Sequence, residues 1–445
     1  MESSKGYYAD EKFADVIASL EAKGWSSCRH WTFPTCCLRY VNYSKIQWKY
    51  IKPYHIVNHL ENAVLLSQKH KLLEYMSTRP SVDYVLPRSF MAKESWILWF
   101  VYYQAVLVLK NANQYLKYIS TALFIATEIK RLNPLPSLSN EQKFNMIDMD
   151  FINKNDGIIL PFLNALEQTE IGPVDDELKK SIDELLQHLV RCDKQFSFIS
   201  TRNLWIAKPS GLSQGRGIEM ITSIAELDQM GLQEGAKFVV QKYVERPLTI
   251  LGRKFDIRQW VLVTKVHPLC VYWYDECYLR FSAKEYNISS DGGQHDKTMH
   301  LCNNSIQKYV DIPHHPEIPD NMWSSQQFQS HLEHVGKHEI WLRQIIPAMK
   351  FACIEAIRSV EHKLRRVGQG FEWLGLDFII DEEFHPWLLE VNVSPDVSHS
   401  TSTTAALVPK ATQDMLSIIL DQEEGGENGW KRLDINNIAD FTYNY

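Results

Sequence analysis

Apolar residues recur at helical spacing near the start of the chain. Within residues 10–25 the apolar positions lie three or four apart and include Phe13, Val16, Ile17 and Leu20. This spacing places them on one face and predicts a packing helix. The same pattern predicts further helices over residues 94–131, 176–196 and 339–367. Pro347 is expected to bend the last of these helices.

Short runs of β-branched and aromatic residues predict strands elsewhere. Residues 28–60 are rich in such residues, and together with the first helix they predict a small N-terminal α/β unit ending near Ser77. After residue 201 strand-like runs alternate with loops. The predicted strands lie at 204–206, 238–240, 257–263, 272–281, 378–380 and 387–389. The chain is therefore expected to be an α/β (α+β) protein.

Composition removes several classes of function. The 445 residues carry 54 acidic and 47 basic side chains, a net charge of −7, so the whole chain is no polybasic nucleic-acid binder. The apolar run from Trp96 to Leu109 is interrupted by Gln104 and is shorter than the ~20 residues a bilayer requires. No secretory signal and no membrane span are expected. The eight cysteines form no Cys-x-x-Cys pair, which favours reduced thiols in the cytoplasm.

A glycine-rich loop follows the strand-like run that contains Lys208. Gly211, Gly215 and Gly217 surround Arg216, and such a loop can bring backbone N–H groups close to phosphate oxygens. It is neither a Walker A motif nor a Rossmann fingerprint. An ordinary glycine-rich loop is the alternative for this pattern taken alone.

Alternating charges mark the strand-like segment after Gly252. Lys254, Asp256 and Arg258 fall on one face because side chains alternate along a strand. Three charges in an otherwise apolar strand are costly to bury unless they bind something charged. Arg280 could add a cation to the same cleft. An exposed, salt-bridged strand face is the alternative.

Two carboxylates and an amide are predicted to meet on a hairpin. Antiparallel pairing about the polar turn 381–386 places Asp377 directly opposite Glu390, and Asn392 shares the face of Glu390. Converging hard oxygen ligands suit Mg²⁺. The predicted metal ligands are therefore Asp377, Glu390 and Asn392. A surface hairpin with acidic decoration is the alternative.

The segments that carry these residues resemble the tubulin tyrosine ligase-like family of ATP-grasp ligases. The matching segments are 205–209, 215–218, 240–247, 253–260 and 389–395, with weaker matches at 56–69 and 87–90. Within the family the sequence is most similar to the tubulin monoglycylases, on the segments 280–282, 300–308 and 320–326. The tyrosine-ligase branch carries threonine where this chain has Cys302.

The resemblance implies an ATP-grasp fold with the nucleotide bound between a central and a C-terminal domain. The expected boundaries are 1–77 for the N-terminal domain, 78–243 for the central domain with a helical insertion, 244–421 for the C-terminal domain and 422–445 for a flexible tail. ATP would be bound by Lys208, Ser213, Gly215, Arg216, Gly217, Ile218, Gln241, Lys242, Tyr243, Lys254 and Asp256. The residues 241–243 would form the hinge against adenine.

The activity implied by the resemblance is ATP-dependent tubulin glycylation. ATP would convert a glutamate γ-carboxylate of a tubulin C-terminal tail into an acyl phosphate, and the amine of glycine would attack it. Arg280 would steady the acyl group, assisted by Lys254 and Arg258, and Mg²⁺ would be required. Leu212 and Gln214 stand where glycylases tend to be basic, which would weaken phosphate or acidic-tail binding.

Three other functions stay open at this point. Two belong to the same family, a polyglutamylase and a tyrosine ligase, and the third is a catalytically weak microtubule-binding pseudoenzyme. The expected partners are tubulin and microtubules, with no nucleic acid and no membrane. A monomer in the cytoplasm and cytoskeleton, including the axoneme of a cilium or flagellum, is the expected form and location.

Overall fold

The computed structural model describes most of the chain, and the described residues form two compact units. The described residues are 5–91, 93–132, 151, 154–165, 169–199, 202–212, 215–230, 237–289, 293–312, 315–421 and 428–439. Unit 1 comprises residues 1–72, 248–286 and 298–445, and unit 2 comprises 73–247 and 287–297.

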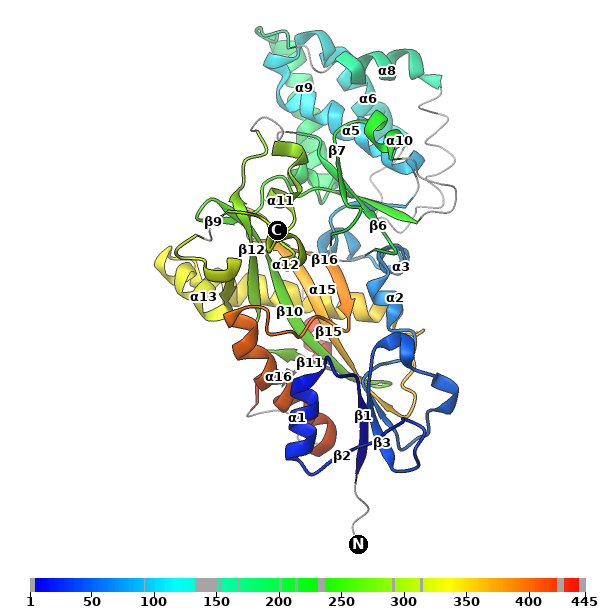
Figure 1. Cartoon of the computed structure of the whole chain (residues 1–445). Helices are drawn as coiled ribbons and strands as arrows, with labels where there is room; N and C mark the ends of the chain where they lie inside the picture. The colour runs from blue at the N-terminus through cyan, green and yellow to red at the C-terminus, as the bar shows by residue number, and fades with distance from the viewer. Residues whose placement is uncertain are drawn as a thin grey trace. The chain divides into compact units, whose positions relative to one another are not determined.

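Unit 1 is built on an eight-stranded sheet around the long strand β10 (Arg253–Val266) (Figure 1). β12 (Tyr278–Glu285) and β15 (Glu372–Ile380) both pair antiparallel with β10, and β16 (Pro386–Val393) pairs with β15. The remaining strands of this sheet are β9 (Thr249–Ile250), β11 (Leu269–Tyr274), β13 (Met322–Ser324) and β17 (Trp430–Arg432). The pairs β10–β15 and β11–β17 join strands that are far apart in the sequence.

A smaller parallel sheet in unit 1 is formed mainly by the N-terminal segment. Its strand order is β14 (Gln369–Gly370), β4 (Ile56–Val57), β3 (Cys36–Tyr40), β1 (Gly6–Ala9) and β2 (Ser26–Ser27). Helices α1 (Ala14–Ala22) and α16 (Ser402–Asp421) lie side by side (Figure 1), and Lys23 and Asp421 form an ion pair of 2.6 Å. A shared apolar core containing Tyr7, Leu20, Trp260 and Met415 joins the first and last thirds of the chain.

Further helices of unit 1 are α2 (Val64–Ser67), α12 (Asn304–Gln307), α13 (Ser325–His334), α14 (His338–Ile340), α15 (Ile346–Val360) and α17 (Ile435–Ala439). Short 3-10 helices lie at Tyr43–Lys45, Trp48–Tyr50 and Pro319–Asn321. Two helices, α3 (Lys69–Met76) and α11 (Lys297–His300), contain a boundary between the units.

Unit 2 contains a four-stranded antiparallel sheet and most of the predicted helical region. The strands are β5 (Ser89–Phe90), β8 (Phe238–Lys242), β6 (Trp205–Pro209) and β7 (Glu219–Ile221), in this order. The helices are α4 (Val82–Val85), α5 (Lys93–Lys110), α6 (Ile119–Leu132), α8 (Asp156–Ala165), α9 (Asp176–Cys192) and α10 (Ile224–Gln229). Short 3-10 helices lie at Ala112–Gln114, Leu116–Tyr118, Phe196–Phe198 and Gly293–His295.

Helix α9 confirms the helix predicted over 176–196, with an earlier end. Asp175 caps its N-terminus by accepting a hydrogen bond from the Leu178 N–H at 2.9 Å. Ile182, Leu185 and Leu189 form its buried face, as the amphipathic pattern requires.

Four local predictions differ from the structure. The helix predicted over 339–367 consists of α14, a π-helical turn at Trp341–Ile345 and α15, and it ends at Val360. Pro347 stands in the first turn of α15, where its missing N–H costs no helical hydrogen bond. The segment 272–281 forms two strands rather than one.

The other two differences concern the two ends of the chain. Within 28–60 the aromatic run 43–50 forms 3-10 turns rather than strands. In the expected tail, Trp430 is fully buried on β17, which pairs with β11. An indole without exposed surface fixes this part of the tail by apolar burial. In the part of the chain that the structure describes, no helix combines the length and the apolarity that crossing a membrane requires.

Candidate active site

Strand β10 carries the three alternating charges on one face, and this face is buried. Lys254, Asp256 and Arg258 are only 5%, 7% and 6% exposed, while Phe255 and Ile257 pack on the opposite face. The alternative of a solvent-exposed charged face is therefore wrong. Buried charges require close partners, and the neighbouring strands supply them.

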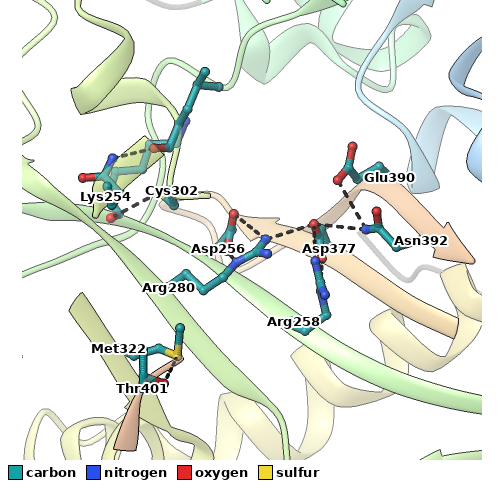
Figure 2. Close-up of polar contacts among 12 residues, drawn as sticks. Lys254, Asp256, Arg258, Arg280, Cys302, Met322, Asp377, Glu390, Asn392 and Thr401 are labelled. Carbon is teal, nitrogen blue, oxygen red and sulfur yellow. Dashed lines mark hydrogen bonds and ion pairs between the residues drawn. The ribbon is translucent and has the colours of Figure 1, made fainter. Parts of the chain in front are cut away.

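Arg280 joins two carboxylates from different strands. It lies opposite Asp256 in the β10–β12 register and donates to it through Nε at 2.6 Å and Nη2 at 2.9 Å. The same Nη2 lies 2.9 Å from Oδ2 of Asp377 on β15. Figure 2 shows the guanidinium between the two carboxylates. Among the residues that the structure describes, no hydrogen bond donated by Nη1 of Arg280 is found.

Asp377 lies directly opposite Glu390, as the hairpin pattern predicts. On the side away from the turn the same register continues, with Leu376 opposite Val391. On the side toward the turn Phe378 pairs with Leu388, so Leu389 is an extra residue that forms a β-bulge. The Asn392 amide nitrogen lies 3.4 Å from Asp377 Oδ2 and 3.3 Å from Glu390 Oε1 (Figure 2). The three predicted metal ligands therefore converge.

Arg258 forms a second pair with Asp377. Its Nε and Nη2 donate to the two carboxylate oxygens at 2.5 Å and 3.2 Å. Gly375 makes room for this side chain, because a Cβ there would lie 3.1 Å from Arg258 Cδ and 2.8 Å from Pro395 Cβ. A larger residue at Gly375 would displace the Arg258–Asp377 pair.

The charges of this cluster shift the pKa values of its members. Burial by itself would raise the pKa of Asp377, but the guanidiniums of Arg258 and Arg280 hold it well below the ordinary value. Asp377 is therefore an anion at neutral pH. Burial lowers the pKa of Lys254, whose ammonium donates to the His300 carbonyl oxygen at 2.8 Å.

Lys69 adds a cation beside the predicted metal ligands. Its ammonium lies 3.2 Å from Glu390 Oε2. With Lys254, Arg258 and Arg280 it makes four cations against the three anions Asp256, Asp377 and Glu390. The cluster thus has a net charge of +1, which favours anionic ligands such as phosphate or carboxylate groups.

The donor set of the hairpin fits Mg²⁺ held together with phosphates rather than a metal held by protein alone. Within the described ranges, no group of three or more His, Cys, Asp or Glu side chains could hold a metal ion. Asp377, Glu390 and Asn392 supply two carboxylates and one amide, and Mg²⁺ commonly takes one or two carboxylates plus substrate oxygens. Glu390 has a 26% exposed side chain, so its oxygens are accessible.

In unit 2, Lys208 and Gln241 face each other on adjacent strands. The Lys208 ammonium donates to Gln241 Oε1 at 2.6 Å, and the Gln241 amide donates to Ser89 Oγ at 2.9 Å. The prediction that a strand delivers Lys208 is confirmed by β6. Gln241 holds the lysine in a defined orientation.

Lys242 is a buried member of a structural ion pair. Its ammonium donates to Glu245 at 2.5 Å and to the Leu204 carbonyl oxygen at 2.8 Å, and burial lowers its pKa. Tyr243 is 4% exposed and its backbone N–H donates to Leu204 at 3.2 Å. Lys242 through its side chain and Tyr243 through its backbone N–H hold the end of β8. Contact of this segment with adenine stays a prediction.

The predicted glycine loop uses left-handed backbone at two positions. Gly215 and Gly217 have φ of 74° and 68°, and a Cβ at Gly217 would lie 2.9 Å from Pro209. Arg216 is exposed, and Ile218 is half-buried. Ser213, also predicted to contact ATP, lies outside the described residues together with Gln214.

Sequence reasoning missed a buried contact near the cluster. His59 Nδ1 lies 2.7 Å from Glu372 Oε1 on β15, and both side chains are 1% exposed. Glu372 Oε2 also accepts the Leu60 N–H at 2.8 Å. A glutamate inside an apolar strand was the available signal, but its partner is 313 positions away. The pair ties the N-terminal segment to the strand that carries Asp377.

Comparison with known proteins identifies the family. The model of the "Tubulin-tyrosine ligase family" matches residues 134–425, more than half of the chain. The chain belongs to this family. Membership agrees with the mixed helices and sheets of both units and confirms the predicted α/β fold of ATP-grasp type.

Several tubulin-tyrosine ligase family members named as glycylases are similar to this chain. "Tubulin monoglycylase TTLL3" of Homo sapiens is 39% identical over 264 residues, which are 58% of this chain and 34% of the relative. "Tubulin glycylase 3A" of Drosophila melanogaster is 38% identical over 233 residues, 51% of this chain and 23% of the relative. "Protein monoglycylase TTLL8" of Homo sapiens is 37% identical over 246 residues, which are 54% of this chain and 28% of the relative. The chain thus spans between 23% and 34% of the length of these relatives.

Proposed function

We propose that this protein is an ATP-dependent ligase that joins glycine to glutamate γ-carboxylates in tubulin C-terminal tails. Its family and the names of its relatives, tubulin monoglycylase and tubulin glycylase, support this activity. The proposed reaction passes through an acyl phosphate, because a carboxylate is a poor electrophile until its oxygen is converted into a leaving group.

The observation that carries the proposal is the cluster around Asp377. Two arginines hold this carboxylate as an anion opposite the accessible Glu390, and the cluster has one more cation than anions. Such a site is suited to highly charged groups, since fixed cations and dipoles can stabilise charge that develops during phosphoryl and acyl transfer.

Each side chain has a role that follows from its contacts. Asp377, Glu390 and Asn392 would hold Mg²⁺, which, when bound, neutralises charge on phosphoryl oxygens. Arg258 keeps Asp377 ionised and oriented. Arg280 is held in place by Asp256, and its Nη1 would donate to the reacting acyl oxygen. Lys208 and the glycine loop would bind ATP phosphates.

The proposal needs no nucleophile from the protein. Cys302 is 4% exposed, and burial raises the pKa of its thiol to about 12, so it is a thiol and not a thiolate at neutral pH. Attack by the glycine amine forms the isopeptide bond and releases phosphate. We further propose that the enzyme acts as a monomer on microtubules in the cytoplasm and axoneme.

The test compares labelled glycine, glutamate and tyrosine as donors, with tubulin, ATP and Mg²⁺. Glycine is expected to be incorporated most, and Glu390→Gln is expected to lower incorporation at least about 100-fold, as loss of a group that stabilises developing charge does. Glu383→Gln is the matched control, because it makes the same change at an exposed position in the turn of the same hairpin.

Three outcomes would contradict the proposal. Preference for glutamate would indicate a polyglutamylase, and preference for tyrosine would indicate a tyrosine ligase. No incorporation of any donor by correctly folded protein would favour the binding-only alternative. Equal incorporation by Glu390→Gln and Glu383→Gln would remove Glu390 from the reaction.

A further inference from the structure

A cavity in the N-terminal parallel sheet contains a buried arginine with no counter-ion. The cavity has a volume of about 310 Å³ and is formed by β1, β3 and the segment 44–51, all within unit 1. This volume lies at the lower end of the range for small-molecule sites. Arg39 lines it from the middle of β3 and is only 6% exposed.

The Arg39 guanidinium lacks the acceptors that a buried cation requires. Its Nε is buried without a hydrogen-bond partner, and in the described part of the chain no carboxylate lies within ion-pair distance of it. Its side-chain neighbours are the ring of His55, with 3.4 Å between Nη2 and Nε2, and the thiol of Cys36, a weak hydrogen-bond acceptor. An uncompensated buried guanidinium is costly to the fold.

His55 is itself a donor toward Arg39. Its Nδ1 accepts the Lys52 backbone N–H at 2.9 Å, so a neutral ring carries its proton on Nε2. Burial and the nearby Arg39 and Lys52 lower the pKa of His55 to about 4, so the ring is neutral at pH 7. Two donors therefore face each other, and neither accepts a hydrogen bond from the other.

The other residues that line the cavity indicate the size and charge of a ligand that could accept hydrogen bonds from Arg39. Trp31 lies under the guanidinium, with 4.6 Å from Cζ to its ring, and Tyr8, Val41 and Ile51 add apolar surface. The other cation of the lining, Lys45, is paired with Asp10 at 2.6 Å. One uncompensated positive charge beside aromatic and apolar surface suits a single carboxylate rather than a multiply charged phosphate.

We propose that this cavity is a carboxylate-binding site in which Arg39 binds the anion and Trp31 packs against the group that carries it. The carboxylate can come from an acidic side chain of a polypeptide or from a small free acid. The site lies wholly in the N-terminal segment and does not depend on the proposed ligase activity.

The test is a calorimetric titration of the whole chain with two pairs of probes. Acetyl-Gly-Glu-Gly-amide is compared with acetyl-Gly-Gln-Gly-amide, and phenylacetate with phenylacetamide. At least one carboxylate is expected to bind about tenfold more tightly than its amide, because a hydrogen-bonded ion pair is lost in the amide. Binding of the peptide alone would assign a polypeptide source, and binding of phenylacetate alone would assign a small acid. Binding of both would show that the site recognises the carboxylate group itself.

Two variants decide whether Arg39 is responsible. Arg39→Met is expected to abolish the preference for the carboxylate without lowering the thermal unfolding midpoint, because it removes an uncompensated buried charge. Lys45→Gln, a change of a paired cation in the same lining, is expected to alter the dissociation constant less than about threefold.

The proposal is overturned by any of three results. They are equal binding of carboxylate and amide, no saturable binding of either carboxylate below about 10 mM, and unchanged binding to Arg39→Met. A marked fall in the unfolding midpoint of Arg39→Met would also overturn it, because the guanidinium would then be a structural group.

Discussion

Asp377 and Glu390 are paired across one hairpin but lie in different environments. The Asp377 side chain is 3% exposed and is bound by two arginines, whereas the Glu390 side chain is 26% exposed and contacts Lys69. Asp377 is therefore part of the fold as well as of the site, and Glu390 belongs mainly to the site. The two substitutions that neutralise these residues should have different consequences.

We expect Asp377→Asn to lower the free energy of unfolding by about 3 kcal/mol, because it leaves two buried arginines without their shared counter-ion. Glu390→Gln should cost less than about 1 kcal/mol, as expected for a partly exposed pair. Urea denaturation followed by tryptophan fluorescence measures both. Equal losses of stability would contradict the division of roles, whatever the activities of the variants are.

The two lysines at the ends of β6 and β8 should also separate stability from ligand binding. Lys242→Met removes the partner of buried Glu245 and should destabilise the protein by about 3 kcal/mol. Lys208→Met removes the donor to the Gln241 amide oxygen and should cost about 1 kcal/mol. The increase in unfolding temperature with ATP and Mg²⁺ should be lost in Lys208→Met. If Lys208→Met is stabilised by ATP as much as the parent, Lys208 is no phosphate ligand.

Cysteine chemistry should not contribute to the activity. Cys192 is exposed, whereas Cys302 is buried and burial raises the pKa of its thiol to about 12. We expect iodoacetamide at pH 7.5 to label Cys192 at least about 100-fold faster than Cys302, as measured by peptide mass spectrometry. Cys302→Ser should keep more than about a third of the ligase activity. Complete loss of activity in Cys302→Ser, with the fold retained, would reopen a role for this thiol.

Acid should destabilise the N-terminal segment through His55. The pKa of His55 is lowered to about 4 by burial and by Arg39 and Lys52, while an unfolded histidine titrates near about 6.5. Between these values the unfolded chain binds a proton that the folded chain does not, so the free energy of unfolding falls as pH decreases. His55 should account for about 1–2 kcal/mol of this fall, allowing for partial solvent screening.

His55→Gln removes the titrating group and keeps an acceptor for the Lys52 N–H. Denaturation at pH 7, 5.5 and 4.5 is therefore expected to show a shallower decline for His55→Gln than for the parent. Parallel declines in the two proteins would show that His55 takes up its proton equally in the folded and unfolded states.

The alternation of charges on β10 and the hairpin of β15 and β16 could be predicted because strand geometry is local. Side chains alternate with a period of two, and a short turn fixes which residues are opposite each other. Lys254, Asp256 and Arg258 therefore share a face in any strand that contains them. The pairing of Asp377 with Glu390 also depends on the bulge at Leu389, because the register near the turn, in which Phe378 pairs with Leu388, would otherwise place Asp377 opposite Leu389. No local pattern in the sequence indicates this bulge.

The partners of these charged residues could not be predicted, because each pair joins segments that are far apart in the sequence. Arg258 and Asp377 are 119 positions apart and His59 and Glu372 are 313 apart, and no local pattern links them. The same holds for Trp430, whose burial turns part of an expected loose tail into a strand. The need for glycine at position 375 becomes visible only in the folded protein, where the Arg258 side chain packs against it.

The sequence by itself determined the faces of the strands, the helix that became α9, the glycine loop and the likeness to a ligase family, because these depend on residue order and backbone geometry. Only the tertiary structure decided that the charged face is buried, that Arg280 joins two carboxylates, and that Arg39 has no counter-ion. Burial and charge compensation are set by segments that meet in space, and a linear pattern does not contain that information.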